Sequence, residues 1–167
     1  IGKHLNEDEV DHVVFSYHGL PESNIKKADS QNVCSFGSCC DQVTDSNRYC
    51  YRAQCMATTK NIVAELGWGD DRYSIAFQSR FGRQAWIQPY LDEHLEKLLE
   101  TGVKKIAVVT PSFVSDCLET IHEIGIEYRE QFMEGGGEVF QLVPNLNDEP
   151  VWFDSVYEIS QSHQNQT

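Results

Sequence analysis

Four short apolar segments recur along the chain, and each predicts a β-strand. Residues 13–17, 73–79, 104–111 and 138–144 are rich in β-branched and aromatic side chains. Their apolar runs are nearly continuous rather than alternating, which is typical of strands that are covered on both faces in a parallel sheet. We therefore expect a parallel sheet with no solvent-facing side.

Helical spacing fills the intervals between these strands. Residues 90–100 carry Leu91, Leu95, Leu98 and Leu99 on one face, and residues 49–66 place Met56, Ile62, Val63 and Leu66 at similar spacing. Residues 114–133 form a third predicted helix. Glycines follow all three segments, at 67, 102 and 135–137, where helices commonly stop.

The resulting β-α-β-α-β-α-β order, with right-handed crossovers, predicts a doubly wound four-stranded parallel sheet with helices on both faces. The length of 167 residues and the 40% hydrophobic content suit a single α/β domain over residues 1–167. Residues 160–167 are polar, and we expect them to be frayed.

Charge narrows the range of partners. The formal net charge is -13, so the surface would repel the phosphate backbone of a nucleic acid, and we do not expect nucleic acid as a ligand. The same charge favours the binding of a metal cation. No apolar run approaches the ~20 residues that a bilayer span needs, and the first residues do not resemble a secretory signal. We expect a cytoplasmic protein. Because the chain starts without methionine just before its first strand, we also expect a fragment that lacks an upstream partner.

Polar and aromatic residues follow the strands where they end. His18 ends the first strand, Ser79 and Arg80 the second, and Phe113 follows the third. The carboxyl ends of parallel strands share one rim of the sheet, so we expect these residues to lie together. A lone histidine more often only caps a strand; here it is also a candidate base or metal ligand.

An acidic stripe begins directly after the third strand. Asp116, Glu119 and Glu123 have i, i+3 and i+7 spacing, which places three carboxylates on one helix face. Such a stripe can be a solvated face near a helix N-terminus, where the macrodipole favours carboxylates. Its position opposite His18 favours instead a divalent cation with nitrogen and oxygen ligands, or a proton relay.

Aromatic and basic residues follow the second strand in a loop. Phe81 and Trp86 either pack against the core or form a wall for a flat apolar ligand. Arg80 and Arg83 could hold carboxylates of that ligand, although surface arginines without such a role are common.

Five of the six cysteines lie in a Ser-, Asn- and Asp-rich insertion at about residues 24–55. They are Cys34, Cys39, Cys40, Cys50 and Cys55, which form two C-x4-C units. In a reducing cytosol, this density favours a thiolate-bound metal over disulfides. Four thiolates suit either zinc or an iron-sulfur cluster, and the spacing does not separate the two.

Three segments carry a family resemblance: "FSYHGLP", "FQSRFGRQAWIQPYLDE" and "SFVSDCLETIHEIGIEY". They resemble, in order, the segments that mark ferrochelatases, which insert Fe(II) into protoporphyrin IX to make haem. The resemblance extends from about residue 13 to residue 144. It implies the carboxyl-terminal half of a fold in which two similar α/β domains face each other across a porphyrin cleft.

The resemblance also implies residue roles. His18 and Glu119 match the residues that face each other at the site of the substrate iron, and Asp116 and Glu123 match acidic positions near them. Ser79, Arg80, Trp86 and Phe113 fall in segments that contact the porphyrin. Cys117 stands where some relatives carry a second histidine, which argues against a mechanism with two histidines.

The insertion also resembles the cysteine-rich insertion that some bacterial ferrochelatases carry at this place. This resemblance favours a [2Fe-2S] cluster as the metal group that the cysteines bind. We expect its ligands to be Cys34, Cys50, Cys55 and one of Cys39 and Cys40, with zinc as the alternative. The resemblance implies that the partners are porphyrin, ferrous iron and the missing amino-terminal half, with at most peripheral contact with the inner membrane, and that this half alone is inactive. Two other functions stay open: a chelatase for another metal or tetrapyrrole, and a thiolate-metal or redox-sensing module.

Overall fold

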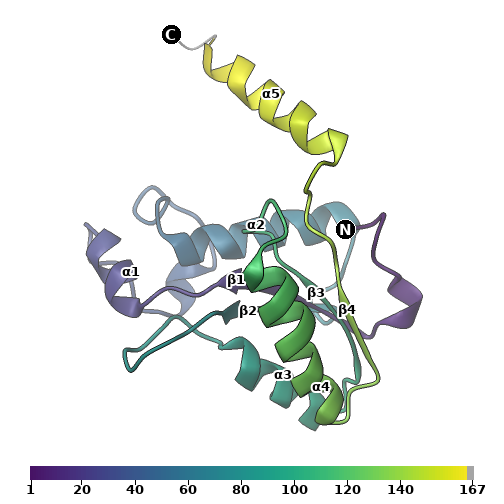
Figure 1. Ribbon diagram of the computed structural model, residues 1–167. Helices are drawn as coiled ribbons and strands as arrows, with labels where there is room; N and C mark the ends of the chain where they lie inside the picture. Colours follow the sequence, from purple (N-terminus) through teal and green to yellow (C-terminus); the bar gives the residue numbers. More distant parts are fainter. Residues whose placement is uncertain (165–167) are drawn as a thin grey trace.

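A four-stranded parallel sheet forms the centre of the molecule in the computed structural model, which describes residues 1–164 (Figure 1). The strands are β1 (His12–His18), β2 (Tyr73–Gln78), β3 (Lys105–Val109) and β4 (Val139–Leu142). Their order in the sheet is β2-β1-β3-β4, and every neighbouring pair is parallel. All four predicted strands are confirmed.

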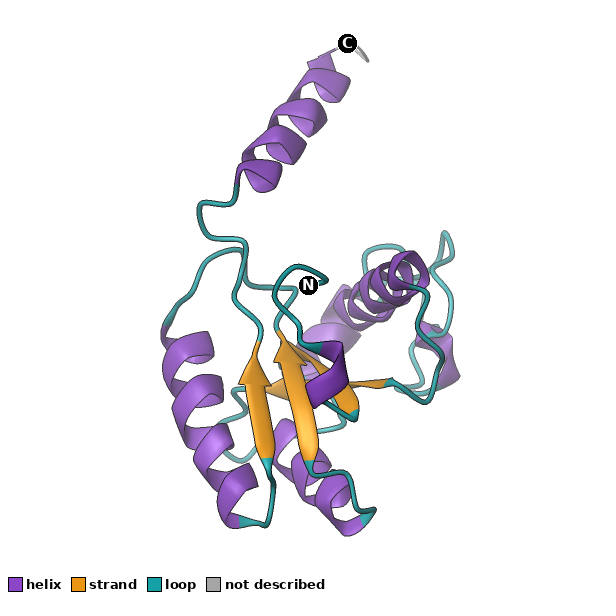
Figure 2. Cartoon of the chain, turned by 90° about the vertical axis from the view of Figure 1, so that its right-hand side faces the viewer, coloured by secondary structure: helices purple, strands orange, loops and turns teal. Residues whose placement is uncertain are grey.

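Helices cover both faces of the sheet, as Figure 2 shows. α2 (Tyr51–Leu66) lies on one face, where Phe15 and Tyr17 of β1 share an apolar cluster with Cys55 of α2. The other face carries α3 (Leu91–Glu100), the π-helix η3 (Glu119–Tyr128) and α4 (Arg129–Glu134). There Val14 packs in a second cluster with leucines of α3 and with Ile124. The doubly wound α/β fold is therefore confirmed.

The third predicted helix is shorter than the prediction and of a different type. Residues 111–117 form a turn, a bend and irregular backbone, and the helix begins at Glu119, capped by Leu118, rather than at residue 114, with π geometry over its first ten residues. Local polar contacts oppose an earlier start: the backbone N–H of Asp116 donates to Asn147 Oδ1 (2.8 Å), and that of Cys117 to Thr120 Oγ1 (2.9 Å).

The buried face of α2 also differs from the expected one. It consists of Ala53, Cys55, Thr59 and Val63, so of the four residues that indicated this helix only Val63 is buried. Thr59 is accommodated because its hydroxyl hydrogen-bonds the Tyr17 hydroxyl at 2.8 Å.

Several elements lie outside the predicted pattern. α1 (Glu22–Ala28) occupies the start of the insertion and buries only Ile25, so no apolar repeat marks it. Short 3-10 turns are present at Glu7–Glu9 (η1) and Ser38–Cys40 (η2).

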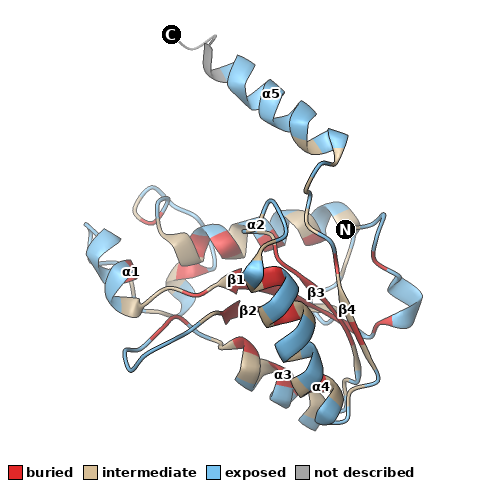
Figure 3. Cartoon of the chain, in the orientation of Figure 1, coloured by how far each residue is buried: buried red, intermediate tan, exposed pale blue. Residues whose placement is uncertain are grey.

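α5 (Pro150–Gln164) extends away from the sheet, with exposed apolar residues along its length (Figures 1 and 3). Residues 160–164 of the tail, which we expected to be frayed, belong to this helix, and residues 165–167 lie outside the described part. Among the described helices, none combines the length and apolar character that crossing a bilayer requires.

The strand order places a natural binding edge beside β1. From β1 the chain moves to one side of the sheet, and from β3 it moves to the other, so the connections diverge between these two strands. Ligands of open α/β sheets bind at this point, at the carboxyl ends of the strands. His18 ends β1 there.

Candidate functional site

His18 lies half-buried at the carboxyl end of β1, with a defined ring orientation. Its Nδ1 is 2.7 Å from the backbone carbonyl of Gly19, which can only accept, so Nδ1 carries the proton. Nε2 is therefore the nitrogen left free of this contact, and it is the atom available to a metal ion or, in the neutral ring, to a proton. A side chain at Gly19 would come within 2.9 Å of the Gln78 carbonyl, so this turn requires glycine.

Two aromatic rings flank the imidazole. The ring centroid of His18 is 6.5 Å from that of Trp86 and 6.4 Å from that of Phe113. The chain after β2 is fixed against the His18 turn, since the N–H of Ile87 donates to the Leu20 carbonyl at 2.9 Å.

Trp86 does not line the cavity beside His18, so it does not form the ligand-facing wall that was one of its two expected roles. It is only 4% exposed, and its Nε1 donates to the Phe81 carbonyl at 3.0 Å. Phe81 packs on it at 5.5 Å and is itself 76% exposed. Phe81 is therefore the outward-facing aromatic surface, and Trp86 supports it from below.

Glu123 joins the π-helix to the end of β2. Its Oε1 accepts the backbone N–H of Ser79 at 2.7 Å, and its Oε2 accepts the Ser79 hydroxyl at 2.5 Å. Buried Gln78 donates to the same Oε2 at 3.3 Å and to the Glu119 carbonyl at 3.1 Å. These contacts hold the first turn of the π-helix against the sheet.

Glu119 and His18 line one open cavity of about 600 Å³ between β1, β2 and the π-helix. The complete lining is His18, Ser79, Arg80, Phe81, Leu118, Glu119, His122, Glu123 and Glu127. A hydrogen bond with Cys117, followed by smaller contributions that include the charge of His18, lowers the pKa of the Glu119 carboxyl. Glu119 is therefore ionised at neutral pH.

Sequence reasoning missed the outer part of this cavity. Glu127 continues the series Glu119 and Glu123 at steps of four residues, which stay on one face because a π-helix has more residues per turn than an α-helix. His122 lies beside it, 3.3 Å from a Glu127 oxygen. The four-residue spacing was visible in the sequence, but the helix type was not.

Two of the expected site residues, Asp116 and Arg80, already bind other side chains of the protein. Asp116 does not line the cavity; its carboxylate accepts the side-chain amides of Asn145 (3.0 Å) and Asn147 (2.9 Å), which follow β4. The expected alignment of Asp116 with Glu119 and Glu123 on one helix face was thus wrong, because the helix starts after Asp116.

Arg80 lines the cavity but already has acidic partners. Its guanidinium is 2.5 Å from Asp92 and 3.3 Å from Glu93 of α3, and it stacks 4.0 Å from the Tyr90 ring. These carboxylates neutralise Arg80 before any ligand arrives. Arg83 is exposed and does not line the cavity.

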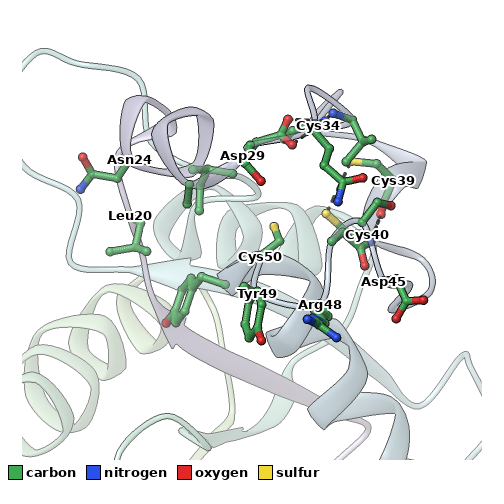
Figure 4. A pocket seen from close by; sticks show the side chains of 18 residues that line it. Leu20, Asn24, Asp29, Cys34, Cys39, Cys40, Asp45, Arg48, Tyr49 and Cys50 are labelled. Atoms are coloured by element: carbon green, nitrogen blue, oxygen red, sulfur yellow. Dashed lines mark hydrogen bonds between the residues drawn. The ribbon is translucent and has the colours of Figure 1, made fainter.

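The insertion lines a second cavity, of about 230 Å³, which Leu20 also borders, two residues after His18 (Figure 4). Four thiols line it: those of Cys34, Cys39, Cys40 and Cys50. The sulfurs of Cys39 and Cys40 are 3.7 Å apart. Burial raises the pKa of the Cys39 thiol, but hydrogen bonds led by that from the Ser35 backbone outweigh burial and lower this pKa to about 6.

Cys55 does not belong to this lining. It is 3% exposed on the core side of α2, where burial raises the pKa of its thiol to about 12. The chemistry of the other four donors fits a thiolate-bound metal, but among residues 1–164 no three Cys, His, Asp or Glu side chains form a group that could hold a metal in this conformation. Metal uptake would require the insertion to draw its thiols closer.

Comparisons with known proteins identify relatives along almost the whole chain. The ferrochelatase family model matches residues 1–164. Among curated ferrochelatases, that of Coxiella burnetii (strain Dugway 5J108-111) is 45% identical over 157 residues, which is 93% of this chain and 44% of the relative. Those of Pseudomonas fluorescens biotype C and Legionella pneumophila (strain Corby) are each 47% identical, over 89% of this chain and 44% of their own length.

A solved structure shares the fold. It is the crystal structure of a putative cobalamin (vitamin B12) biosynthesis CbiX protein from Marinobacter aquaeolei VT8, with a TM-score of 0.52 and 12% identity over 93% of this chain and 98% of that protein. The curated relatives are more than twice as long as the matched region, so this chain spans about 44% of their length.

Proposed function

This chain belongs to the ferrochelatase family, and we propose that the protein containing it inserts Fe(II) into protoporphyrin IX to form haem. The observation that carries the proposal is the shared cavity of His18 and Glu119, which places an imidazole and an ionised carboxylate at the carboxyl edge of the sheet. Insertion releases two pyrrole protons and takes up one dication, so a base and a cation ligand are the groups that the reaction needs.

His18 serves as the base. Because its Nδ1 proton is donated to the Gly19 carbonyl, Nε2 is left to accept a pyrrole proton at the porphyrin centre. Binding of the substrate iron by the same nitrogen is the alternative use of that lone pair. Each role requires the fixed ring orientation that the Gly19 contact provides.

Glu119 ligates the incoming iron or receives the protons that leave His18. Its lowered pKa keeps it anionic, which suits a ligand of Fe(II). Glu123 supports it by fixing the π-helix, and Glu127 and His122 extend a path of polar groups from Glu119 to the outer surface. Asp116 acts in this scheme only through the loop that it shares with Asn145 and Asn147.

The porphyrin lies against Phe81, with Trp86 and Phe113 behind it as supports for His18. Ser79 and Arg80 line the same side of the cavity. Aromatic faces suit a planar macrocycle because they gain contact area with little loss of side-chain entropy.

The opposite wall of the cleft comes from the amino-terminal half of the same protein. The chain spans 44% of its relatives, and α5 carries exposed apolar residues that an additional domain would cover. We infer that residues 1–167 form a single α/β domain that folds but does not catalyse alone. The protein is cytoplasmic, with at most peripheral contact with the inner membrane.

The insertion holds a [2Fe-2S] cluster, with zinc as the alternative metal. Cys34, Cys39, Cys40 and Cys50 are the candidate ligands because they line one cavity, and the buried Cys55 becomes the least suitable of the five. When bound, such a cluster supplies a one-electron redox centre and ties the insertion together.

The test uses the full-length protein under anaerobic conditions with protoporphyrin IX and ferrous iron. Haem absorption is expected to appear with the wild type and with the control His4→Ala, whose histidine contacts Glu149 outside the cavity. His18→Ala should lose insertion while porphyrin fluorescence titration still shows binding. Wild-type turnover in His18→Ala would remove the proposed role. Preference for cobalt or nickel, or for another tetrapyrrole, would favour the alternative chelatase activity.

A further inference from the structure

Tyr51 links the cavity lined by Cys34, Cys39, Cys40 and Cys50, called here the thiol cavity, to His18 of the candidate site. It is the first residue of α2 and lines the thiol cavity, while its hydroxyl donates to the backbone carbonyl of His18 at 2.8 Å. The same hydroxyl interacts with Ser112, in the segment that follows β3. Tyr51 therefore connects the insertion to the ends of β1 and β3, where the candidate site is built.

Cys50 and Tyr51 are neighbours with different surroundings. The Cys50 thiol lines the cavity of the insertion, and its backbone N–H donates to the Asn47 carbonyl at 2.8 Å. Asn47 is buried and its side-chain amide donates to the carbonyls of Cys39 (2.7 Å) and Gln42 (2.9 Å). Cys50 is bonded directly to Tyr51, so a metal that drew the Cys50 thiol toward the other three would act on the first turn of α2.

The His18 turn is held by hydrogen bonds on the sheet side and borders the insertion on the other. On the sheet side, β1 is paired with β2 up to His18, and the Gly19 backbone N–H donates to the Gln78 carbonyl at 2.8 Å. On the other side, Leu20 forms part of the wall of the thiol cavity. The hydrogen bond from Tyr51 thus reaches His18 where the turn borders the insertion.

We propose that Tyr51 is a positioning residue for His18 and transmits the metal-loading state of the thiol cavity to the imidazole through its hydrogen bond to the His18 carbonyl. The effect on catalysis rests on the proposed function, since it requires that His18 takes part in metal insertion. The structural coupling does not depend on that activity.

The decisive experiment follows the His18 imidazole resonances of the metal-free full-length protein by NMR, assigned by their absence in His18→Gln. Zinc chloride is added, or ferrous iron with sulfide under anaerobic conditions, and metal content is measured. The resonances should shift on loading in the wild type and in Tyr49→Phe. They should remain in place in Tyr51→Phe at equal metal content. Tyr49 is the matched control because it flanks Cys50 on the other side and is 80% exposed.

Equal shifts in Tyr51→Phe, or no shift in the wild type, would overturn the coupling. Failure of Tyr51→Phe to bind metal would assign Tyr51 to the thiol site itself and would also overturn it. In the insertion assay, Tyr51→Phe should lower kcat about fivefold to tenfold with KM for porphyrin unchanged, as expected for the loss of one hydrogen bond. A wild type that shows the resonance shift but inserts no iron would remove the proposed function and leave the coupling in place.

Discussion

Ser79 donates two hydrogen bonds to Glu123, one from its backbone N–H to Oε1 at 2.7 Å and one from its hydroxyl to Oε2 at 2.5 Å. The pair joins the end of β2 to the π-helix, and its two residues are 44 positions apart in the sequence. Glu119 lies one helical turn away, so its place opposite His18 depends on this contact.

Glu123→Gln should therefore disturb both stability and activity. The amide can accept only at its oxygen, so one Ser79 donor loses its partner, and we expect a loss of about 1–3 kcal/mol in the free energy of unfolding. Urea denaturation of the full-length protein measures it, with the exposed Glu130→Gln as control. Ser79→Ala, which keeps the backbone donor, should lose less. Equal stability of Glu123→Gln and Glu130→Gln would contradict this role.

Glu119→Gln should abolish most iron insertion without unfolding the protein. We expect kcat to fall by about 10²–10³, as for loss of a proton acceptor or a metal ligand, while porphyrin binding is kept. Because the pKa of Glu119 is lowered from 4.5, its charge is constant above that pH, and it contributes no pH dependence between about pH 5 and pH 8. A rate profile in which only Glu119→Gln loses a titration step in this range would disprove the assignment.

Stability should fall as the solution is acidified below about pH 6.5, because of one buried histidine, His12, and one half-buried histidine, His94. The Ser74 hydroxyl bridges His12 Nε2 (2.8 Å) and His94 Nε2 (2.7 Å), and burial lowers the pKa of both imidazoles. The unfolded chain then binds protons that the folded chain does not, so their contribution is complete above the unfolded pKa and declines below it.

Thermal unfolding of the full-length protein at several values from about pH 7.5 to about pH 5 measures this decline. Replacing His94 by Gln should flatten the profile, whereas His122→Gln, at an exposed position, should not. A wild-type Tm that is constant over the range would be the contrary outcome.

Cysteine labelling should distinguish the candidate ligands from Cys55. In the metal-free protein, iodoacetamide should modify Cys39 and Cys50 before Cys55, since Cys55 is 3% exposed and burial raises the pKa of its thiol to about 12. Zinc or iron with sulfide should protect Cys34, Cys39, Cys40 and Cys50 and should leave Cys117 reactive. Peptide mass spectrometry gives the order, and protection of Cys55 together with a reactive Cys39 would restore the ligand set first expected.

α5 should be stabilised only in the complete protein. Phe153 is 58% exposed here, and if the amino-terminal half covers it, Phe153→Asp should cost the full-length protein about 2–4 kcal/mol. The same substitution in the isolated chain should cost less than about 0.5 kcal/mol, as is usual at a surface position. Ser155→Asp on the same helix is the control. A small effect of Phe153→Asp on both the full-length protein and the isolated chain would show that the amino-terminal half does not cover α5.

Local sequence determined the architecture. The nearly continuous apolar runs of the strands are buried only if both faces of the sheet are covered. The glycines at 67 and 102 end the preceding helices at the expected places. Once the strands are parallel, the rim that carries His18, Ser79 and Arg80 follows from the direction of the chain. These features depend on neighbours in sequence, so pattern alone predicts them.

Only the tertiary structure decided how the site is arranged. Asp116 was separated from Glu119 because Asn145 and Asn147, which follow another strand, bind its carboxylate. Trp86 became a buried support because Phe81 covers it. The sequence grouped five cysteines by proximity in the chain, whereas the fold turned Cys55 toward the core and left four around one cavity. These outcomes depend on contacts between distant segments, whose energies no local pattern records.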